Sequence, residues 1–433
     1  MLKKSESATP KYRSLGLFPK LYAAFGAMTF LLYFFAQHYL GINLASRLIF
    51  NSSDGWCVGT LPVFGPHCFG DFGLGIIMVE NNHQVWTPTG SYPPGNYPAA
   101  PFAIYALFRF LLINFGYTFT IFLYLAALAA CTLMPLWFLS RQYQIADRIF
   151  LVMTLGIFSV PFLSVIDRGN TTAFIIPCIL LAYSGARIQS DKIQTLGIVL
   201  ATLLRPQAIL LVFIFVIQRK YLAAFKAASL SLLMNLFVMF TWDHSNFTSN
   251  LKYFYDSLVG YGNKSISADF PYNYSLARGV YKFIEFLNLE SSTKTLEDAS
   301  SLVGYFLIGA LLLIAYAKKI QDFKTLYYLV LVSMFLMAPV TFIYYTVFIL
   351  LIVAIAIDEE EGNIRKRESI ISFRKLTLLL FGMTLTPFYV PSPVSPHWNL
   401  IQIYLPLLWV IWVLYVAWIL LRNKTRTLDL NIK

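Results

Sequence analysis

Residues 191–220 read DKIQTLGIVLATLLRPQAILLVFIFVIQRK, an apolar stretch with charged residues at both ends. The apolar run from 193 to 218 is too long for one ordinary membrane crossing. Arg205-Pro206 interrupts this run, and proline breaks a helix because it has no backbone N–H to donate. The stretch therefore predicts two short helices that meet at Arg205-Pro206 and have their other ends on one side of a membrane.

The whole chain has the composition of a membrane protein. Of its 433 residues, 58% are hydrophobic and 12% are charged, and the mean hydropathy is +0.64. Soluble domains contain about 45–50% apolar and about 25% charged residues. The net charge of +12 would suggest a nucleic-acid partner if the basic residues shared one face, but they stand in short clusters between apolar runs. We therefore expect a polytopic, all-α integral membrane protein that contacts lipid and binds no nucleic acid.

Apolar runs of spanning length recur along the chain. They fall at 21–40, 118–139, 149–166, 171–186, 221–241, 301–317, 325–338, 340–357, 374–390 and 399–421. Together with the two helices of 193–218, they predict about twelve transmembrane helices.

Basic clusters predict the orientation, because cytoplasmic loops carry an excess of lysine and arginine. The clusters are Lys3, Lys4, Lys11, Arg13 and Lys20; Arg187 and Lys192; Arg219 and Lys220; Lys318, Lys319 and Lys324; Arg365, Lys366 and Arg367; and Arg422, Lys424 and Arg426. They predict cytoplasmic tails at 1–20 and 422–433, a membrane module at 21–240 with a long outer loop at 41–98, an outer loop at 241–300, and C-terminal membrane helices at 301–421. Arg205-Pro206 and the connections 167–170 and 391–398 then lie outside.

Segment 99–115 complicates this topology. It is hydrophobic enough to span the membrane, which would give an odd number of crossings, whereas two cytoplasmic termini require an even number. We expect it to enter the outer leaflet and return without crossing. In the alternative, the turn 140–148, with Arg141 and Arg148, lies outside against the charge rule.

Loop 41–98 contains the leading catalytic candidate, Asp71. Residues 72–80 are apolar and are expected to form a short interfacial helix that holds Asp71 at the membrane boundary. A carboxylate there can take a proton from a hydroxyl that attacks a lipid-attached electrophile. The competing interpretation is that Asp71 caps the helix that follows it.

Two arginines at the predicted outer ends are candidates for binding phosphate. Burying the Arg205 guanidinium within an apolar run costs several kcal/mol unless the group is paired or hydrated, so Arg205 either meets a carboxylate or faces an anionic ligand. Its planar fork of donors suits phosphate. The turn Asp167-Arg168-Gly169-Asn170 is either a simple turn of good turn-forming residues or a second part of the same site.

Other loop residues are weaker candidates. Tyr92 begins the segment Tyr92-Pro93-Pro94, which is either a proline-stiffened link or part of a substrate site, and His397 and His244 are lone loop histidines. Four loop aromatics are expected either to stack on sugar faces or to belong to an interfacial belt: Trp56, Trp86, Tyr92 and Tyr97.

The cysteines allow one disulfide, and the sequence contains no common metal-binding motif. Cys57 and Cys68 share the outer loop, and a disulfide between them would stabilise the fold by about 2–3 kcal/mol. No C-x-x-C or H-E-x-x-H motif occurs, so no metal site is predicted. Whether the protein needs a divalent ion stays open, because Asp71, Glu80 and His67 could hold one only if the fold brings them together.

These motifs together resemble a known family. Asp71-Phe72 after a first span, followed by Tyr92-Pro93-Pro94, looks like the C-type superfamily of membrane glycosyltransferases. Arg168-Gly169-Asn170, and Leu203-Leu204-Arg205-Pro206 in a split span followed by Arg219-Lys220, are similar to glycosyltransferase family 87, also called domain of unknown function 2029. The resemblance covers roughly residues 20–240.

The resemblance implies a function. That family includes bacterial polyprenyl-phosphate-mannose-dependent α-mannosyltransferases, so we expect an enzyme of the bacterial cytoplasmic membrane whose site faces outside. Its partners would be a polyprenyl-phosphate sugar as donor, with mannose favoured, and a glycolipid or glycan as acceptor, with no other cofactor expected. Asp71 matches the catalytic aspartate, and Asn170 matches the asparagine of the turn; Arg205 stands where the family more often has lysine. Asp54 is a rival for the catalytic role, because the distance from the first span to Asp71 is long.

Two other classes of membrane protein remain as alternatives. A lipid-linked oligosaccharide flippase or small-solute transporter would have charges along a path through the membrane and some internal symmetry. A polysaccharide polymerase or ligase would have its main outer loop late in the chain, and 242–300 is a large loop with Arg278 and several lysines.

Overall fold

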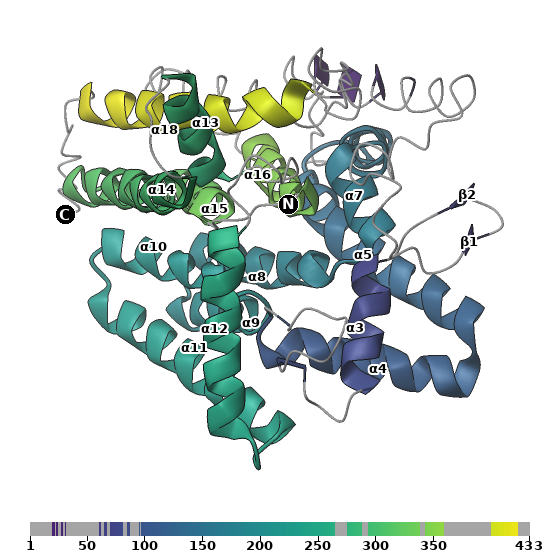
Figure 1. Ribbon diagram of the computed structural model, residues 1–433. Helices are drawn as coiled ribbons and strands as arrows, with labels where there is room; N and C mark the ends of the chain where they lie inside the picture. Colours follow the sequence, from purple (N-terminus) through teal and green to yellow (C-terminus); the bar gives the residue numbers. More distant parts are fainter. Residues whose placement is uncertain are drawn as a thin grey trace, which may run out of the picture.

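The structure is a computed structural model of the chain (Figure 1). It describes residues 60–61, 65–66, 70–80, 85–86, 95, 97–264, 275–287, 293–337, 343–358 and 400–422, and a few positions between 20 and 31. The predicted span 374–390 and most of 21–40 lie outside the described residues.

The described chain is almost entirely helical, as the sequence predicts. The first half contains α3 (Gly70–Glu80), α4 (Ala99–Phe115), α5 (Tyr117–Leu139), α6 (Ile145–Leu151), the π-helical η1 (Val152–Ile157), α7 (Val160–Arg168), the 3₁₀ turn η2 (Thr171–Phe174), α8 (Ile175–Arg187), α9 (Asp191–Leu204), the 3₁₀ turn η3 (Pro206–Leu211), α10 (Val212–Ile217) and α11 (Tyr221–Trp242). The second half contains α12 (Phe247–Lys264), α13 (Leu276–Phe286), α14 (Thr293–Ala317), α15 (Phe323–Met337), the 3₁₀ turn η4 (Ile343–Thr346), α16 (Val347–Asp358) and α18 (Leu400–Arg422). Two-residue strands β1 (Thr60–Leu61) and β2 (Gly65–Pro66) pair antiparallel within loop 41–98.

Three described helices are long and apolar enough to cross a membrane: Tyr117–Leu139, Tyr221–Trp242 and Lys294–Ala317. Shorter apolar helices stand beside them, including α15 and α16, whose side chains are almost all buried. Figure 1 shows α15 and α16 between the teal helices α8 to α10 and the yellow helix α18. The core is therefore made of apolar helices surrounded by other apolar helices, as in a membrane bundle.

The break at Arg205-Pro206 is confirmed. α9 ends at Leu204, and Arg205 is extended, with φ −147° and ψ 118°. Pro206 then begins η3, which continues into α10. A residue before proline avoids helical backbone angles, which explains why the break falls at Arg205.

α8 and α9 form a closely packed antiparallel hairpin. A Cβ atom at Gly185 would collide with the backbone of Gln194, and one at Gly197 would collide with the backbone of Ala182. Glycine and alanine let membrane helices approach this closely. The two helices therefore pack backbone against backbone, which fixes where each end of the hairpin lies.

Each end of the hairpin brings together residues that are far apart in the sequence. At one end, Asn170 precedes α8 and contacts Arg205, which follows α9; the Asn170 Oδ1 to Arg205 Nη2 distance is 2.7 Å. At the other end, Asp191 begins α9 and pairs with Lys220, just before α11, at 2.7 Å. The first end holds the predicted site residues, and the second holds predicted cytoplasmic basic residues.

The turn 140–148 belongs to the second end. Gln142 Nε2 donates to the backbone carbonyl oxygen of Ile357 at 3.0 Å. The next residue, Asp358, is buried and pairs with Arg187 at 3.2 Å and with Lys324 at 3.5 Å. Arg187 ends α8, so the turn lies on the same side as two of the basic clusters. The alternative topology, in which 140–148 lies on the opposite side from the basic cluster at Arg187, is therefore not observed in the described residues.

Three segments differ from their expected form. Segment 99–115 is one continuous helix, α4, that does not fold back on itself. The run 149–166 is interrupted by η1 and then by a turn at Phe158 and Ser159, before α7 begins at Val160. The expected loop 241–300 contains α12, α13 and the first turns of α14. Its helices have one apolar face each, a weaker signal than a continuous apolar run.

Candidate active site

Asp71 lies in the first turn of α3, which the aromatic ring of Phe72 anchors. The Phe72 ring packs at 4.4 Å from Tyr124 of α5 and edge-on to Phe108 of α4 at 6.4 Å. Asp71 is the second residue of the helix, so it does not occupy the N-cap position. The expected short helix is confirmed, and Asp71 stands in its first turn.

The turn after α7 presents two side chains to Asp71. Gly169 has the left-handed backbone angles φ 60° and ψ 38°, which glycine adopts without strain, and it ends α7 at Arg168. The Gly169 carbonyl oxygen accepts a hydrogen bond from the Tyr124 hydroxyl at 2.7 Å. This fixed turn directs Arg168 and Asn170 toward α3.

Each oxygen of the Asp71 carboxylate has its own partner. Oδ1 lies 3.1 Å from Arg168 Nη2, and Oδ2 accepts a hydrogen bond from Asn170 Nδ2 at 2.6 Å. The Asp71 side chain keeps 12% of its surface exposed and Arg168 keeps 16%. Asp71 is therefore oriented from one side and still open to a ligand from the other.

Asn170 links Asp71 to Arg205. Its amide nitrogen donates to Asp71 and, at 3.3 Å, to the Tyr97 hydroxyl. Its carbonyl oxygen accepts from Arg205 Nη2 at 2.7 Å and from the Thr172 backbone N–H at 2.8 Å. Every contact requires the same orientation of the amide, so a polarised amide dipole joins the cation to the carboxylate.

Arg205 is buried, with 2% of its surface exposed. Nη2 donates to Thr172 Oγ1 at 2.5 Å as well as to Asn170, and Nη1 reaches the Tyr345 hydroxyl at 3.4 Å. The guanidinium carbon lies 4.1 Å from the ring centroid of Tyr97 and 5.4 Å from that of Tyr345. Oxygen acceptors and two aromatic faces therefore compensate for the water that this charge gives up.

Tyr97 supports this cation in the neutral state. Burial raises the pKa of Tyr97, which lies in the loop before α4, and the nearby Arg205 only partly offsets this. The hydroxyl therefore stays protonated at neutral pH. One face of the Tyr97 ring is therefore occupied by Arg205.

The fold brings together four of the predicted site residues: Asp71, Arg168, Asn170 and Arg205. Trp86 is fully buried beside Phe102 and Phe254, so its predicted stacking on a sugar does not hold. Glu80 ends α3 and pairs with Arg109 at 3.3 Å, away from Asp71. His244 stacks near Phe240 at 6.3 Å, at the end of α11.

Several predicted residues lie outside the part of the chain that the structure describes. Asp167 belongs to α7, but its side chain lies outside the described residues. The same holds for the other loop candidates: Asp54, Trp56, Cys57, His67, Cys68, Tyr92 and His397. Within the described ranges, no three acidic, histidine or cysteine side chains form a group that could hold a metal ion.

Three residues of the network were not predicted from the sequence: Thr172, Tyr124 and Tyr345. Thr172 stands two positions after Asn170, a spacing typical of local side-chain turns, so it could have been found. Tyr345 is 140 positions from Arg205, and no local pattern connects them.

Comparison with known protein families shows which family the chain belongs to. Residues 91–339, more than half of the chain, match the model of glycosyltransferase family 87. The matched segment contains Arg168, Asn170 and Arg205 and extends beyond the expected limit at 240. It begins after Asp71 and ends before Tyr345. No curated protein and no solved structure matches the chain.

Proposed function

Because the chain belongs to glycosyltransferase family 87, we propose that this membrane enzyme transfers a hexose, with mannose favoured, from a polyprenyl-phosphate donor to a glycolipid or glycan acceptor. The family makes the protein a sugar-transferring enzyme. The observation that supports the site is the Asp71 carboxylate, held by Arg168 and Asn170 beside the buried cation Arg205.

In this mechanism Asp71 acts as the base. The acceptor hydroxyl approaches the exposed side of the carboxylate and gives up its proton as its oxygen attacks the anomeric carbon. The bond from that carbon to the phosphate oxygen breaks on the opposite face, which inverts the configuration in one displacement. Asn170 and Arg168 hold the carboxylate in one orientation, so little reorganisation is needed when the proton moves.

The two arginines stabilise the leaving phosphate. Charge grows on the phosphate as the bond breaks, so fixed cations nearby lower the barrier. Arg168 is the more accessible of the two and is the better placed for direct contact. Arg205 has 2% of its surface exposed, so it acts on the phosphate mainly through the electrostatic field of its charge and through its contact with Asn170. A phosphate leaves without an acid to protonate it, so no second carboxyl group is required.

We also propose that the site faces outward from a bacterial cytoplasmic membrane that the chain crosses about twelve times. Asp71 and Arg205 lie at one end of the α8–α9 hairpin. Arg187, Lys192 and Lys220 lie at its other end. Because basic residues favour the cytoplasmic side, the catalytic end belongs outside.

Membranes that contain the protein would be incubated with radiolabelled polyprenyl-phosphate sugars, one sugar at a time. With the mannosyl donor, we expect label to enter a glycolipid or glycan in membranes that contain the unchanged protein. Membranes that contain Asp71→Asn should show no such transfer. Asp147→Asn, in α6 at the other end of the bundle, is the matched control and should transfer normally. Transfer by Asp71→Asn at the rate of the control would exclude this assignment of the base.

A further inference from the structure

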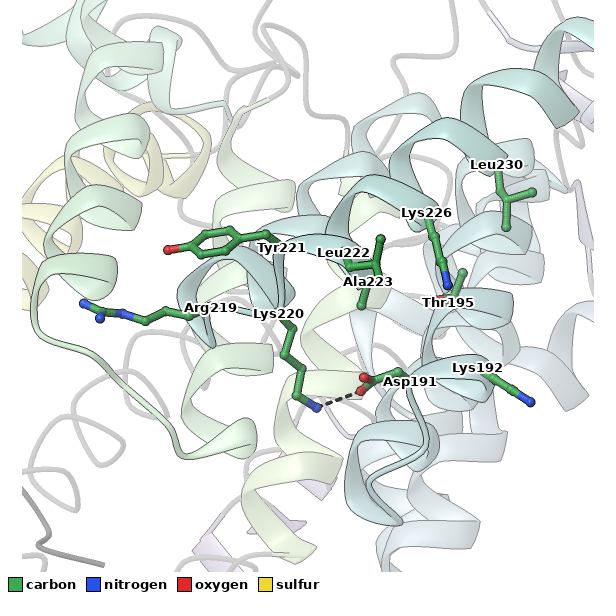
Figure 2. Close-up of a pocket in the computed structure, with 10 residues that line it drawn as sticks. All are labelled: Asp191, Lys192, Thr195, Arg219, Lys220, Tyr221, Leu222, Ala223, Lys226 and Leu230. Atoms are coloured by element: carbon green, nitrogen blue, oxygen red, sulfur yellow. Dashed lines mark hydrogen bonds and ion pairs between the residues drawn. The ribbon is translucent and has the colours of Figure 1, made fainter.

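A pocket of about 740 Å³ lies at the end of α9 opposite Arg205 (Figure 2). The first turn of α9 contributes Lys192 and Thr195, and the beginning of α11 contributes Lys226 and Leu230. The pocket begins where both helices begin and runs toward their apolar middle, so it belongs to neither the Asp71 nor the Arg205 cluster.

The pocket has more positive than negative charge. Four basic side chains line it, Lys192, Arg219, Lys220 and Lys226, against the single carboxylate of Asp191. Lys220 pairs with Asp191 at 2.7 Å, shown as the dashed line in Figure 2. Neither Lys192 nor Lys226 forms an ion pair with any residue that the structure describes. A net positive charge is therefore left for a ligand.

One wall of the pocket is apolar and open. Leu222 exposes 67% of its surface and Leu230 exposes 45%, and the neighbouring Phe225 exposes 70%. All three belong to α11, a helix apolar enough to cross a membrane. Lys226 stands among them, five residues after the helix begins. A lysine at this depth extends its ammonium group toward the headgroup region, where lipid phosphates lie.

We propose that this pocket binds the headgroup of an anionic phospholipid. The phosphate lies between Lys192 and Lys226, and the acyl chains continue along the exposed side chains of Leu222 and Leu230. Basic pockets between membrane helices at the cytoplasmic face bind anionic headgroups in this way. The volume suits a phosphodiester headgroup with the first part of its chains. The proposal requires the membrane location but not the proposed sugar transfer.

Native mass spectrometry of the full-length protein, with defined lipids added, tests the proposal. The probes are phosphatidylglycerol, which is anionic, and phosphatidylcholine, which has no net charge. The double variant Lys192→Gln/Lys226→Gln should retain phosphatidylglycerol about 30-fold more weakly, because each lysine contributes about fivefold and the two effects multiply. Lys192→Arg/Lys226→Arg keeps the charges and should bind as the unchanged protein does.

The matched control is Lys252→Gln/Lys294→Gln, which removes two exposed lysines outside the pocket. It should retain phosphatidylglycerol fully, and all variants should unfold at the same temperature. Equal retention by Lys192→Gln/Lys226→Gln, or equal retention of phosphatidylcholine, would overturn the proposal. So would complete displacement of phosphatidylglycerol by millimolar inorganic phosphate, because the pocket would then bind an ion and not a lipid.

Discussion

Asn170 Oδ1 lies 2.7 Å from Arg205 Nη2, although 35 positions separate the two residues along the chain. The hairpin of α8 and α9 runs from one residue away and back to the other, so its two open ends meet. Because Asn170 also holds Asp71 at 2.6 Å, the contact connects the predicted phosphate-binding arginine to the predicted base.

Asp71→Asn should reduce kcat by about 10²- to 10⁴-fold, the usual contribution of a positioned general base. The amide keeps the size of the side chain but cannot accept the proton. The measurement is turnover with the labelled donor, with the folded fraction checked by size-exclusion chromatography. Near-normal turnover together with an inactive Asp54→Asn would transfer the catalytic role to Asp54.

The two arginines should differ in their kinetic effects. Arg168→Ala removes the more accessible cation and should lower kcat as well as raise the KM for the donor, because Arg168 would stabilise the charge that grows on the phosphate. Arg205→Ala should weaken donor use more than acceptor use and should also lower the unfolding temperature, because it leaves the buried Asn170 and Thr172 oxygens without a charged donor. If Arg205→Ala had the same kinetic effects as Arg168→Ala and unfolded at the temperature of the unchanged protein, the buried position of Arg205 would be contradicted.

Asn170→Ala and Arg205→Ala should be strongly non-additive. Each change breaks the same contact, so the double variant should lose little more activity than the worse single variant. A double-mutant cycle on kcat measures this coupling. Effects that simply add would mean that the amide of Asn170 does not join the two groups.

Tyr97 should show graded effects on stability. Tyr97→Phe loses the hydroxyl contact to Asn170 but keeps the ring 4.1 Å from Arg205. Tyr97→Leu loses both and should be less stable by about a further 0.5–2 kcal/mol, the size of a partly buried cation–π contact. The order of unfolding temperatures in detergent checks this, with unchanged protein highest and Tyr97→Leu lowest.

Thr172→Val replaces a hydroxyl with a methyl group of similar size. The hydroxyl donates to Asn170 Oδ1 and accepts from Arg205, both at 2.5 Å. Its loss should cost about 1–3 kcal/mol of stability and reduce kcat, whereas Thr172→Ser should restore both. Loss of activity in Thr172→Ser as severe as in Thr172→Val would assign the role to the methyl group.

The sequence predicted the parts of this site that depend on local rules. Arg205-Pro206 broke its helix because proline imposes that geometry on any chain, and charge placement put residues 167–170 on the side of Arg205. The shared contact of Asn170 and Arg205 was not predicted. It depends on the close packing of α8 and α9 at Gly185 and Gly197, and on helices of matching length.

Local rules could not predict contacts between residues that are far apart in the sequence. Tyr345 reaches Arg205 from a segment 140 positions away, and only the packed bundle places it there. The aromatic residues show the same limit. Trp86 and Tyr97 stand in a polar loop, where exposure is the ordinary expectation, yet the fold buries Trp86 and stacks Tyr97 on a cation.

The shortness of α9 has a consequence for where the reaction takes place. Its 14 residues span only about 21 Å, whereas the hydrocarbon core of a bilayer is about 30 Å thick. If its lysine-rich end lies level with the headgroups, Arg205 and its neighbours lie about 9 Å below the opposite surface. In the proposed function, the sugar would then be transferred below the level of the headgroups, and the acceptor hydroxyl would have to reach that depth.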